Sequence, residues 1–213
     1  KGTVDELRYL ARVINATQAE PYRKSFDRGL AYVFKAQYPN GGWPQFFPLR
    51  KGYYDRITFN DNATLGADLT LVTTNANVLF GGTVNSDNTA ARDLTVNAGS
   101  GAVTFTGAVG DAVGINNGPV GALAVNTTGA TTFVDTVDAA NVTTNTGGTV
   151  VIKGGRITTS GEQTYNDDVL LDNAAARATA LNTTNAVVLF GAKLSNNTAN
   201  AEALTVNTGS GAV

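Results

Sequence analysis

Residues 94–97 read Leu-Thr-Val-Asn and residues 99–103 read Gly-Ser-Gly-Ala-Val, and both words return 110 positions later, at residues 204–207 and 209–213. Apolar residues alternate with small polar ones, which predicts short strands with one buried face. The glycine-rich words predict turns that accept positive φ. Because one such strand-and-turn unit cannot bury its own apolar face, copies must stack. The sequence therefore predicts a β-solenoid.

The same offset of 110 relates further words. Thr-Thr-Asn-Ala occurs at residues 73–76 and 183–186, and Val-Leu-Phe-Gly occurs at residues 78–81 and 188–191. Predicted strands also recur at a shorter spacing within this unit, and they start at Leu94, Leu123, Leu204, Val103, Thr131 and Val150. The spacing predicts coils of roughly 20–30 residues, each stacked on the next.

The chain changes character near Asp61. Residues 1–61 hold 12 of the 17 aromatic side chains, ten of the 15 basic residues and six of the 17 acidic ones, which gives this part a net charge of +4 and the remainder −6. We predict two domains, a helical segment over residues 1–61 and the solenoid repeat region over residues 62–213. The fold class is mixed and mainly β.

The first 61 residues contain two amphipathic patterns. Apolar residues recur at helical spacing over residues 4–14 and again over residues 26–34, and a polar link lies between them at residues 15–21. Two such helices joined by a short link predict an αα-hairpin. Residues 38–44 then contain Pro-Asn-Gly-Gly, which predicts a turn carrying Trp43. Its aromatic face suits a sugar ring or the cap of a small helical core, and both interpretations stay open.

Composition excludes several kinds of chemistry. Cys and His are absent, so thiolate catalysis and a histidine base are excluded, and carboxylates, Lys, Arg, Tyr or a hard metal ion remain. A net charge of −2 favours neither nucleic acid nor an anionic membrane as a partner. No apolar run reaches the roughly 18 residues of a membrane span. The chain begins without Met and ends inside a repeat, so we expect a fragment whose signal sequence is not included.

Three words carry a resemblance. Residues 5–11, 36–45 and 54–61 resemble the family 10 pectate lyases, and the resemblance covers residues 1–63. It implies a secreted bacterial enzyme built as an α/α toroid, which cleaves polygalacturonate (pectin) by Ca²⁺-assisted β-elimination. Ca²⁺ binds oxygen ligands and can bridge protein and substrate carboxylates, so this chemistry needs no His.

The resemblance also implies roles for single residues. Asp61 becomes a candidate calcium or uronate contact with Asn60 beside it, Arg56 and Lys51 become partners for uronate carboxylates, and Trp43 becomes a sugar contact. Asp61 could equally be the N-cap of a helix that is missing from this chain. The family's arginine base and a further acidic residue have no match here. The catalytic module is therefore incomplete, no catalytic set is complete, and we expect negligible lyase activity from this chain.

A second resemblance covers residues 57–213. The words at residues 161–167 and 94–97 are similar to β-strand repeats of bacterial surface proteins of the filamentous-haemagglutinin and autotransporter type. It implies a right-handed parallel β-helix that serves as an adhesin or stalk at the cell surface, with contacts or self-association through the solenoid ends and no catalysis.

Other polar words in the repeat region have simpler interpretations. The acidic cluster of Asp167, Asp168 and Asp172 is compatible with Ca²⁺ but is better explained as a solvated turn. Asn126 and Asn182 lie in Asn-X-Thr triplets, which we interpret as turn residues before a strand rather than glycosylation sites.

The two resemblances meet at a shared word. Residues 58–61 read Thr-Phe-Asn-Asp and residues 164–167 read Thr-Tyr-Asn-Asp. No linker separates the parts, whereas natural fusions usually join complete domains through exposed segments. The sequence suggests a chimaera, with two candidate functions: a lyase fragment, or a structural repeat segment.

Overall fold

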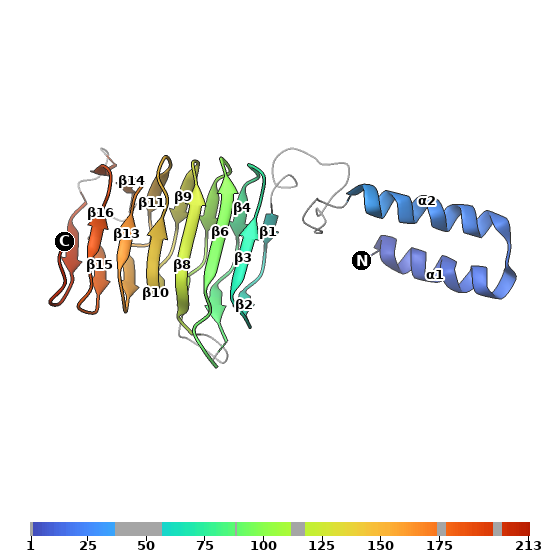
Figure 1. Ribbon diagram of the computed structural model, residues 1–213, viewed down its shortest axis with the longest axis horizontal. Coiled ribbons are helices and arrows are strands. Elements are labelled where there is room, and N and C mark those ends of the chain that lie inside the picture. Colours follow the sequence, from blue (N-terminus) through green and yellow to red (C-terminus); the bar gives the residue numbers. More distant parts are fainter. Residues whose placement is uncertain (1, 37–56, 88, 112–117, 174–177, 198–201) are drawn as a thin grey trace. The chain divides into compact units, whose positions relative to one another are not determined.

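The computed structural model describes residues 2–36, 57–87, 89–111, 118–173, 178–197 and 202–213 (Figure 1). The chain divides into two compact units, residues 1–55 and residues 56–213. The first is helical where it is described and the second consists of short parallel strands, which confirms the predicted αα-hairpin followed by a parallel β-solenoid.

The helical unit contains α1 (Gly2–Thr17) and α2 (Glu20–Ala36), which pack against each other. Gln18 ends α1 with a φ of 53°, the left-handed conformation common just after a helix. Gly29 lets the helices approach, because a Cβ built there would stand 2.8 Å from Leu7 Cδ2. Among residues 5–36, whose burial the structure describes, Ile14 is the one buried apolar side chain. This pair of helices therefore has little core of its own.

The solenoid unit is built from three sheets whose strands follow one another along the unit (Figure 1). The largest continuous ladders run parallel throughout. The seven-stranded sheet consists, in order, of β1 (Ile57–Phe59), β4 (Val78–Phe80), β7 (Val103–Phe105), β9 (Ala130–Phe133), β11 (Thr149–Ile152), β14 (Asp168–Leu171) and β17 (Leu194–Asn196).

The second sheet has nine strands and branches at β10. Its main path contains β3 (Leu69–Val72), β6 (Leu94–Gly99), β8 (Val120–Thr127), β10 (Val137–Thr144), β12 (Arg156–Thr159), β15 (Thr179–Thr183) and β18 (Leu204–Asn207). The long strand β10 pairs with β12 through its first half and with β13 (Gln163–Tyr165) through its second half, and β13 in turn pairs with β16 (Val188–Phe190). A two-stranded sheet joins β2 (Ala63–Leu65) to β5 (Val84–Ser86).

The pairing register of the strands confirms that strands recur at this shorter spacing. Leu94 pairs with Leu123, and Val103 pairs with Thr131, which pairs with Val150. Parallel pairing across successive coils is what a solenoid requires, since the strands of each coil pair with those of the coil before it.

The two copies of the 110-residue repeat do not occupy equivalent positions in the sheets. Val78–Phe80 forms β4 of the seven-stranded sheet, but its copy Val188–Phe190 forms β16, which pairs with β13 on the branch from β10. Likewise Val84–Ser86 belongs to the two-stranded sheet and its copy Leu194–Asn196 to the seven-stranded sheet. The repeated words thus specify a strand and its turn, not the face of the coil on which they fall.

The core runs along the inside of the stacked coils. Burial alternates along the strands, so that in β6 Leu94, Val96 and Ala98 are buried while the residues between them are partly exposed. Four phenylalanine rings from successive coils stack in line at centroid distances of 4.9, 4.7 and 5.3 Å; they are Phe59, Phe80, Phe105 and Phe133. The stack fixes the coil spacing in the first half of the unit.

Asn and Asp side chains tie each corner to the adjacent coil. The Oδ1 atom of Asn75 accepts the N–H of Ser100 at 2.9 Å, and that of Asn185 accepts the N–H of Ser210 at the same distance. Asn77 accepts the N–H of Ala102 at 2.8 Å. These bonds satisfy turn amides that no strand pairs, which explains why Asn is so frequent in the repeat words.

The interpretation of Asn126 and Asn182 as turn residues is wrong. Asn126 lies in β8 and Asn182 in β15. Asn126 Nδ2 donates to Asn97 Oδ1 at 2.7 Å, and Asn207 Nδ2 donates to Asn182 Oδ1 at 2.8 Å. Side-chain amides stacked in register can bond from coil to coil, and this gain offsets the low strand preference of Asn.

Candidate functional site

Three of the five predicted site residues, Trp43, Lys51 and Arg56, lie outside the described residues. Asn60 and Asp61 lie directly after β1 and are exposed. Asp61 is followed by β2, so no helix begins at Asp61 in this chain. Of the five predicted site residues, the described part of the chain therefore contains only Asn60 and Asp61.

The turn that holds Asp61 is shaped by its neighbour Asn62. Asn62 Oδ1 accepts the N–H of Thr83 in the next coil at 3.0 Å. A Cβ at Gly82 would stand 2.6 Å from that oxygen and from the carbonyl carbon of Asp61, so the two coils touch here through backbone. The described residues contain no group of three or more Asp, Glu, His or Cys side chains that could hold a metal ion. Asp61 alone does not fit Ca²⁺, which takes six to eight oxygen ligands.

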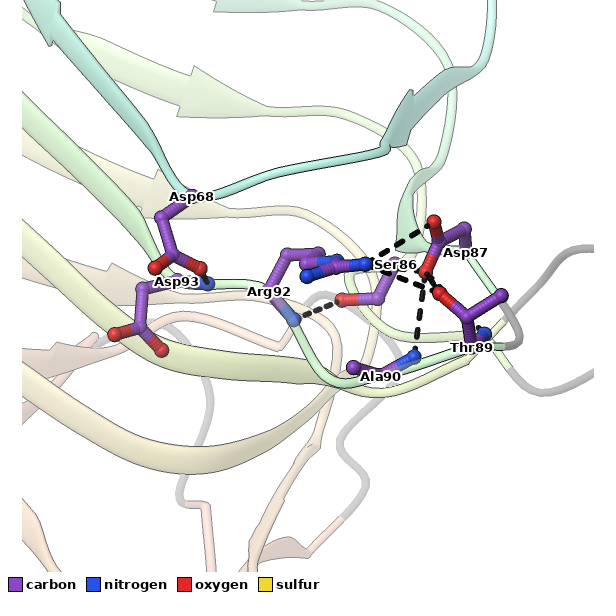
Figure 2. Close-up of polar contacts among 7 residues, drawn as sticks. All are labelled: Asp68, Ser86, Asp87, Thr89, Ala90, Arg92 and Asp93. Carbon is purple, nitrogen blue, oxygen red and sulfur yellow. Dashed lines mark hydrogen bonds and ion pairs between the residues drawn. The ribbon is translucent and has the colours of Figure 1, made fainter.

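The densest polar cluster lies between β5 and β6 (Figure 2). Asp87 Oδ1 accepts bonds from the Thr89 hydroxyl at 2.7 Å and from the N–H groups of Thr89 and Ala90, both at 3.3 Å. Arg92 forms an ion pair with Asp87, with 3.4 Å between Nε and Oδ1, and Arg92 Nη2 donates to the Thr89 hydroxyl at 3.0 Å. The hydrogen bond from Thr89 is the largest of the contacts that lower the pKa of Asp87.

Beside this cluster, two aspartates link three successive coils. Asp68 Oδ1 accepts the N–H of Asp93 at 3.0 Å, and Asp93 Oδ1 accepts the N–H of Ala122 at 2.7 Å. Figure 2 shows the side chains of Asp68 and Asp93 close together, with the Asp68 carboxylate directed at the Asp93 backbone. Gly121 is required at the next coil, because a Cβ there would stand 2.2 Å from Asp93 Oδ1.

Chemically, these contacts hold the loop in place. The Asp87 carboxylate and the Arg92 guanidinium engage each other, and the Arg92 N–H is bound to Ser86 Oγ at 2.7 Å. Sequence reasoning did not identify this cluster; an aspartate two residues before a threonine is the signal for such a side-chain turn.

An open groove of about 450 Å³ lies on the solenoid unit and reaches the loop between β5 and β6 at Ala91. Its lining includes Asp138, Thr158, Ser160 and Thr184 together with small apolar residues. Asp138 is held by two hydrogen bonds from Arg156, at 2.8 and 2.9 Å. The groove therefore offers hydroxyl groups and one neutralised carboxylate.

The acidic cluster of the repeat region does not converge on one point. Asp168 Oδ1 accepts the N–H of Lys193 at 3.1 Å, and Asp172 Oδ2 forms an ion pair with Lys153 Nζ at 2.8 Å. Asp167 is buried, so its interpretation as part of a solvated turn is wrong. The next buried polar residues, Gln163 and Tyr165, bond to each other, with 3.0 Å between the Tyr165 hydroxyl and Gln163 Oε1, and burial raises the pKa of Tyr165. Within residues 161–167 the buried side chains of Gln163, Tyr165 and Asp167 thus alternate with more exposed ones.

Comparison with known proteins gives one family. A family model described as pectic acid lyase matches residues 1–101, which is just under half of the chain. The matched stretch extends beyond residue 63 and includes the helical unit and the strands from β1 to β6. In the described part of residues 57–101 the structure has parallel strands where an α/α toroid has helices. Neither the curated proteins nor the solved structures give a significant match.

A separate finding concerns membranes. Neither of the described helices is both long and apolar enough to span a bilayer.

Proposed function

We propose that this chain is a fragment of a secreted bacterial protein related to the pectate lyases, whose complete module acts on polygalacturonate. The observation that carries the proposal is the match of the pectic acid lyase family to residues 1–101. The words at residues 36–45 and 54–61 fall inside that match, as do the five residues to which the resemblance gives a role.

In the complete module, Ca²⁺ would neutralise the substrate carboxylate and lower the pKa of the neighbouring C–H group. Asp61 and Asn60 would contact the metal or the uronate, Arg56 and Lys51 would pair with uronate carboxylates, and Trp43 would stack on a sugar ring. A base, a metal shell and a substrate clamp must act together in such a reaction. The present chain supplies one exposed carboxylate of this set in its described part, so we propose that it is inactive.

The test is an assay of the purified chain on polygalacturonate with Ca²⁺, following the absorbance of unsaturated uronate products. We expect no release above a protein-free control. Release that disappears in Asp61→Ala and on chelation of Ca²⁺ would show that the chain is an active lyase. The matched control is Asp68→Ala, since Asp68 is also an exposed aspartate next to a short strand but lies outside the words that carry the resemblance.

A second candidate is a structural role as a repeat segment of a bacterial surface protein of the adhesin type. The continuous parallel ladder from β1 to β17, with its ring stack and corner amides, supports this role. Binding of oligogalacturonate that needs both Ca²⁺ and Arg56 would favour the lyase relationship. A chain with no uronate affinity that associates through its solenoid ends would favour the structural role.

We also propose that the chain is chimaeric, because two different patterns meet at the word Thr-Phe-Asn-Asp of residues 58–61. A single transcript that contains residues 40–100 without interruption would exclude an artificial join. A transcript that continues the lyase pattern after Asp61 would support one.

A further inference from the structure

Asp167 lies between β13 and β14 and joins two coils. Its side chain is only 1% exposed. Its Oδ1 atom accepts the N–H of Gly148, in the turn between β10 and β11, at 2.7 Å. Gly148 is itself tightly enclosed, because a Cβ there would stand 2.5 Å from the carbonyl oxygen of Gly129. The Asp167 carboxyl group therefore stands at a close contact between coils.

The second carboxyl oxygen has no donor. Asp167 Oδ2 is buried without a hydrogen-bond partner among the described residues, and so is the hydroxyl oxygen of Thr144 on β10. The Thr144 hydroxyl nevertheless acts on the Asp167 carboxyl group and lowers its pKa, although the two groups do not have the geometry of a formed hydrogen bond. An ionised oxygen buried without a donor is costly. The Thr144 hydroxyl can donate to an ionised Oδ2 or accept from a protonated one, and burial favours the second arrangement because it leaves no charge in the interior.

Few other charges surround this carboxyl group. Asp168 on β14 repels its negative form, and Lys193 on the next coil is engaged with Asp168 through its backbone N–H. The 145–148 turn contains no titratable side chain, and the one on β10, Asp138, is paired with Arg156. Burial is the largest influence and raises the pKa of Asp167, against the hydrogen bond from Gly148 and the hydroxyl of Thr144.

We propose that Asp167 is a proton-operated latch of the solenoid. In the closed form the protonated Oδ2 donates to Thr144 Oγ1 while Oδ1 holds the Gly148 N–H. Ionisation sends this proton to solvent and leaves a buried negative charge beside Asp168, which loosens the contact between these two coils. The latch is independent of any lyase activity.

The direction of the pH dependence follows. Because the folded state raises the pKa of Asp167 above its ordinary value of 3.8, folding retains a proton that the unfolded chain releases. The stabilisation is complete below the ordinary value, falls as the pH rises towards the folded-state pKa, and is gone above it.

The test is the urea midpoint of the full chain from pH 4 to pH 8 in three proteins. We expect Asp167→Asn, whose amide can donate to Thr144 at every pH, to raise the midpoint at pH 8 and to flatten the decline seen in the wild type. Asp168→Asn, the exposed neighbour, is expected to keep most of that decline, because repulsion from Asp168 is the smallest of the influences on the pKa of Asp167. An Asp167→Asn protein with the wild-type slope, or one destabilised equally at every pH, would overturn the latch.

Infrared spectroscopy of the wild-type protein gives a second reading that needs no variant. The C=O band of one protonated carboxylic acid is expected to persist to a higher pH than the bands of the other Asp and Glu side chains, because the pKa of Asp167 is raised. Loss of all protonated-carboxyl bands together as the pH rises would also overturn the proposal.

Discussion

Gly99 occupies a turn position that only glycine fits. Its φ is +60°, and a Cβ would stand 2.3 Å from Asn75 Oδ1, the atom that binds the N–H of Ser100. We expect Gly99→Ala to lower the free energy of unfolding by about 1–3 kcal/mol, from backbone strain and displacement of Asn75. The measurement is urea unfolding. Gly66→Ala is the control, since nothing lies within 4 Å of its added Cβ, and an equal loss in both variants would contradict the argument.

Asp172 should give the opposite pH dependence to Asp167. The hydrogen bond from Lys153 is the main cause that lowers the pKa of Asp172, and the bond from Asn197 adds to it. A lowered pKa contributes stability above 3.8 that is lost as the pH falls below it. We expect Lys153→Met to remove part of that acid sensitivity, at a cost below about 1 kcal/mol at pH 7 because the pair is solvated.

Urea unfolding between pH 2.5 and pH 7 measures this effect. Lys193→Met is the matched control, because the described residues give the Lys193 side chain no ion pair. If both lysine variants change the acid sensitivity alike, net charge rather than the Asp172 contact is responsible.

At the residue scale, the sequence indicated which positions form turns but not where polar side chains are buried. Asn75 and Gly99 could be predicted because their backbone preference is local. Asp167 and Asn126 could not, since their environment depends on which coil lies above or below them. Among the predicted lyase residues, Asp61 was identified from a short sequence motif. Which residues contact Asp61 could not be predicted, because that depends on parts of the chain far from it in sequence.

At the scale of elements, the phenylalanine stack is the clearest packing feature. Phe105 is fully buried and lies between Phe80 and Phe133, at centroid distances of 4.7 and 5.3 Å. We expect Phe105→Ala to lower the free energy of unfolding by about 3–5 kcal/mol, because it opens a cavity in the middle of the stack. The loss of stability should be far smaller for Val134→Ala, because Val134 is an exposed apolar residue just after β9, the strand that carries Phe133.

Chemical denaturation of both variants decides the point. A Phe105→Ala protein as stable as Val134→Ala would mean that the ring stack does not hold the coils together.

The sequence could predict that these segments form strands, but it could not predict which sheet each strand joins. Alternation and turn words are local signals, so the strands at Leu94, Leu123 and Val103 were identified correctly. Which face of the coil a strand occupies depends on the summed lengths of all turns before it. The turns differ in length, and so Val78–Phe80 and its copy Val188–Phe190 arrive on different ladders.

At the scale of the whole molecule, the two units differ in how much they bury. The solenoid has a continuous interior of buried apolar residues. Among residues 5–36 only Ile14 is buried, while Tyr9 and Phe34 are 67% and 61% exposed. A two-helix hairpin with so little buried surface has little to offset the entropy of ordering its chain. We expect the helical unit to unfold long before the solenoid.

Limited proteolysis of the purified chain, with fragments identified by mass, measures this difference. We expect a resistant fragment that begins near residue 56 and retains the strands, because cleavage needs local unfolding that the stacked coils oppose. The same digestion with Ca²⁺ tests the lyase relationship. Protection of residues 1–55 only when Ca²⁺ is present would show that the metal orders this part of the chain and would make Asp61 the first residue to substitute. Equal resistance of both units without Ca²⁺ would contradict the burial argument.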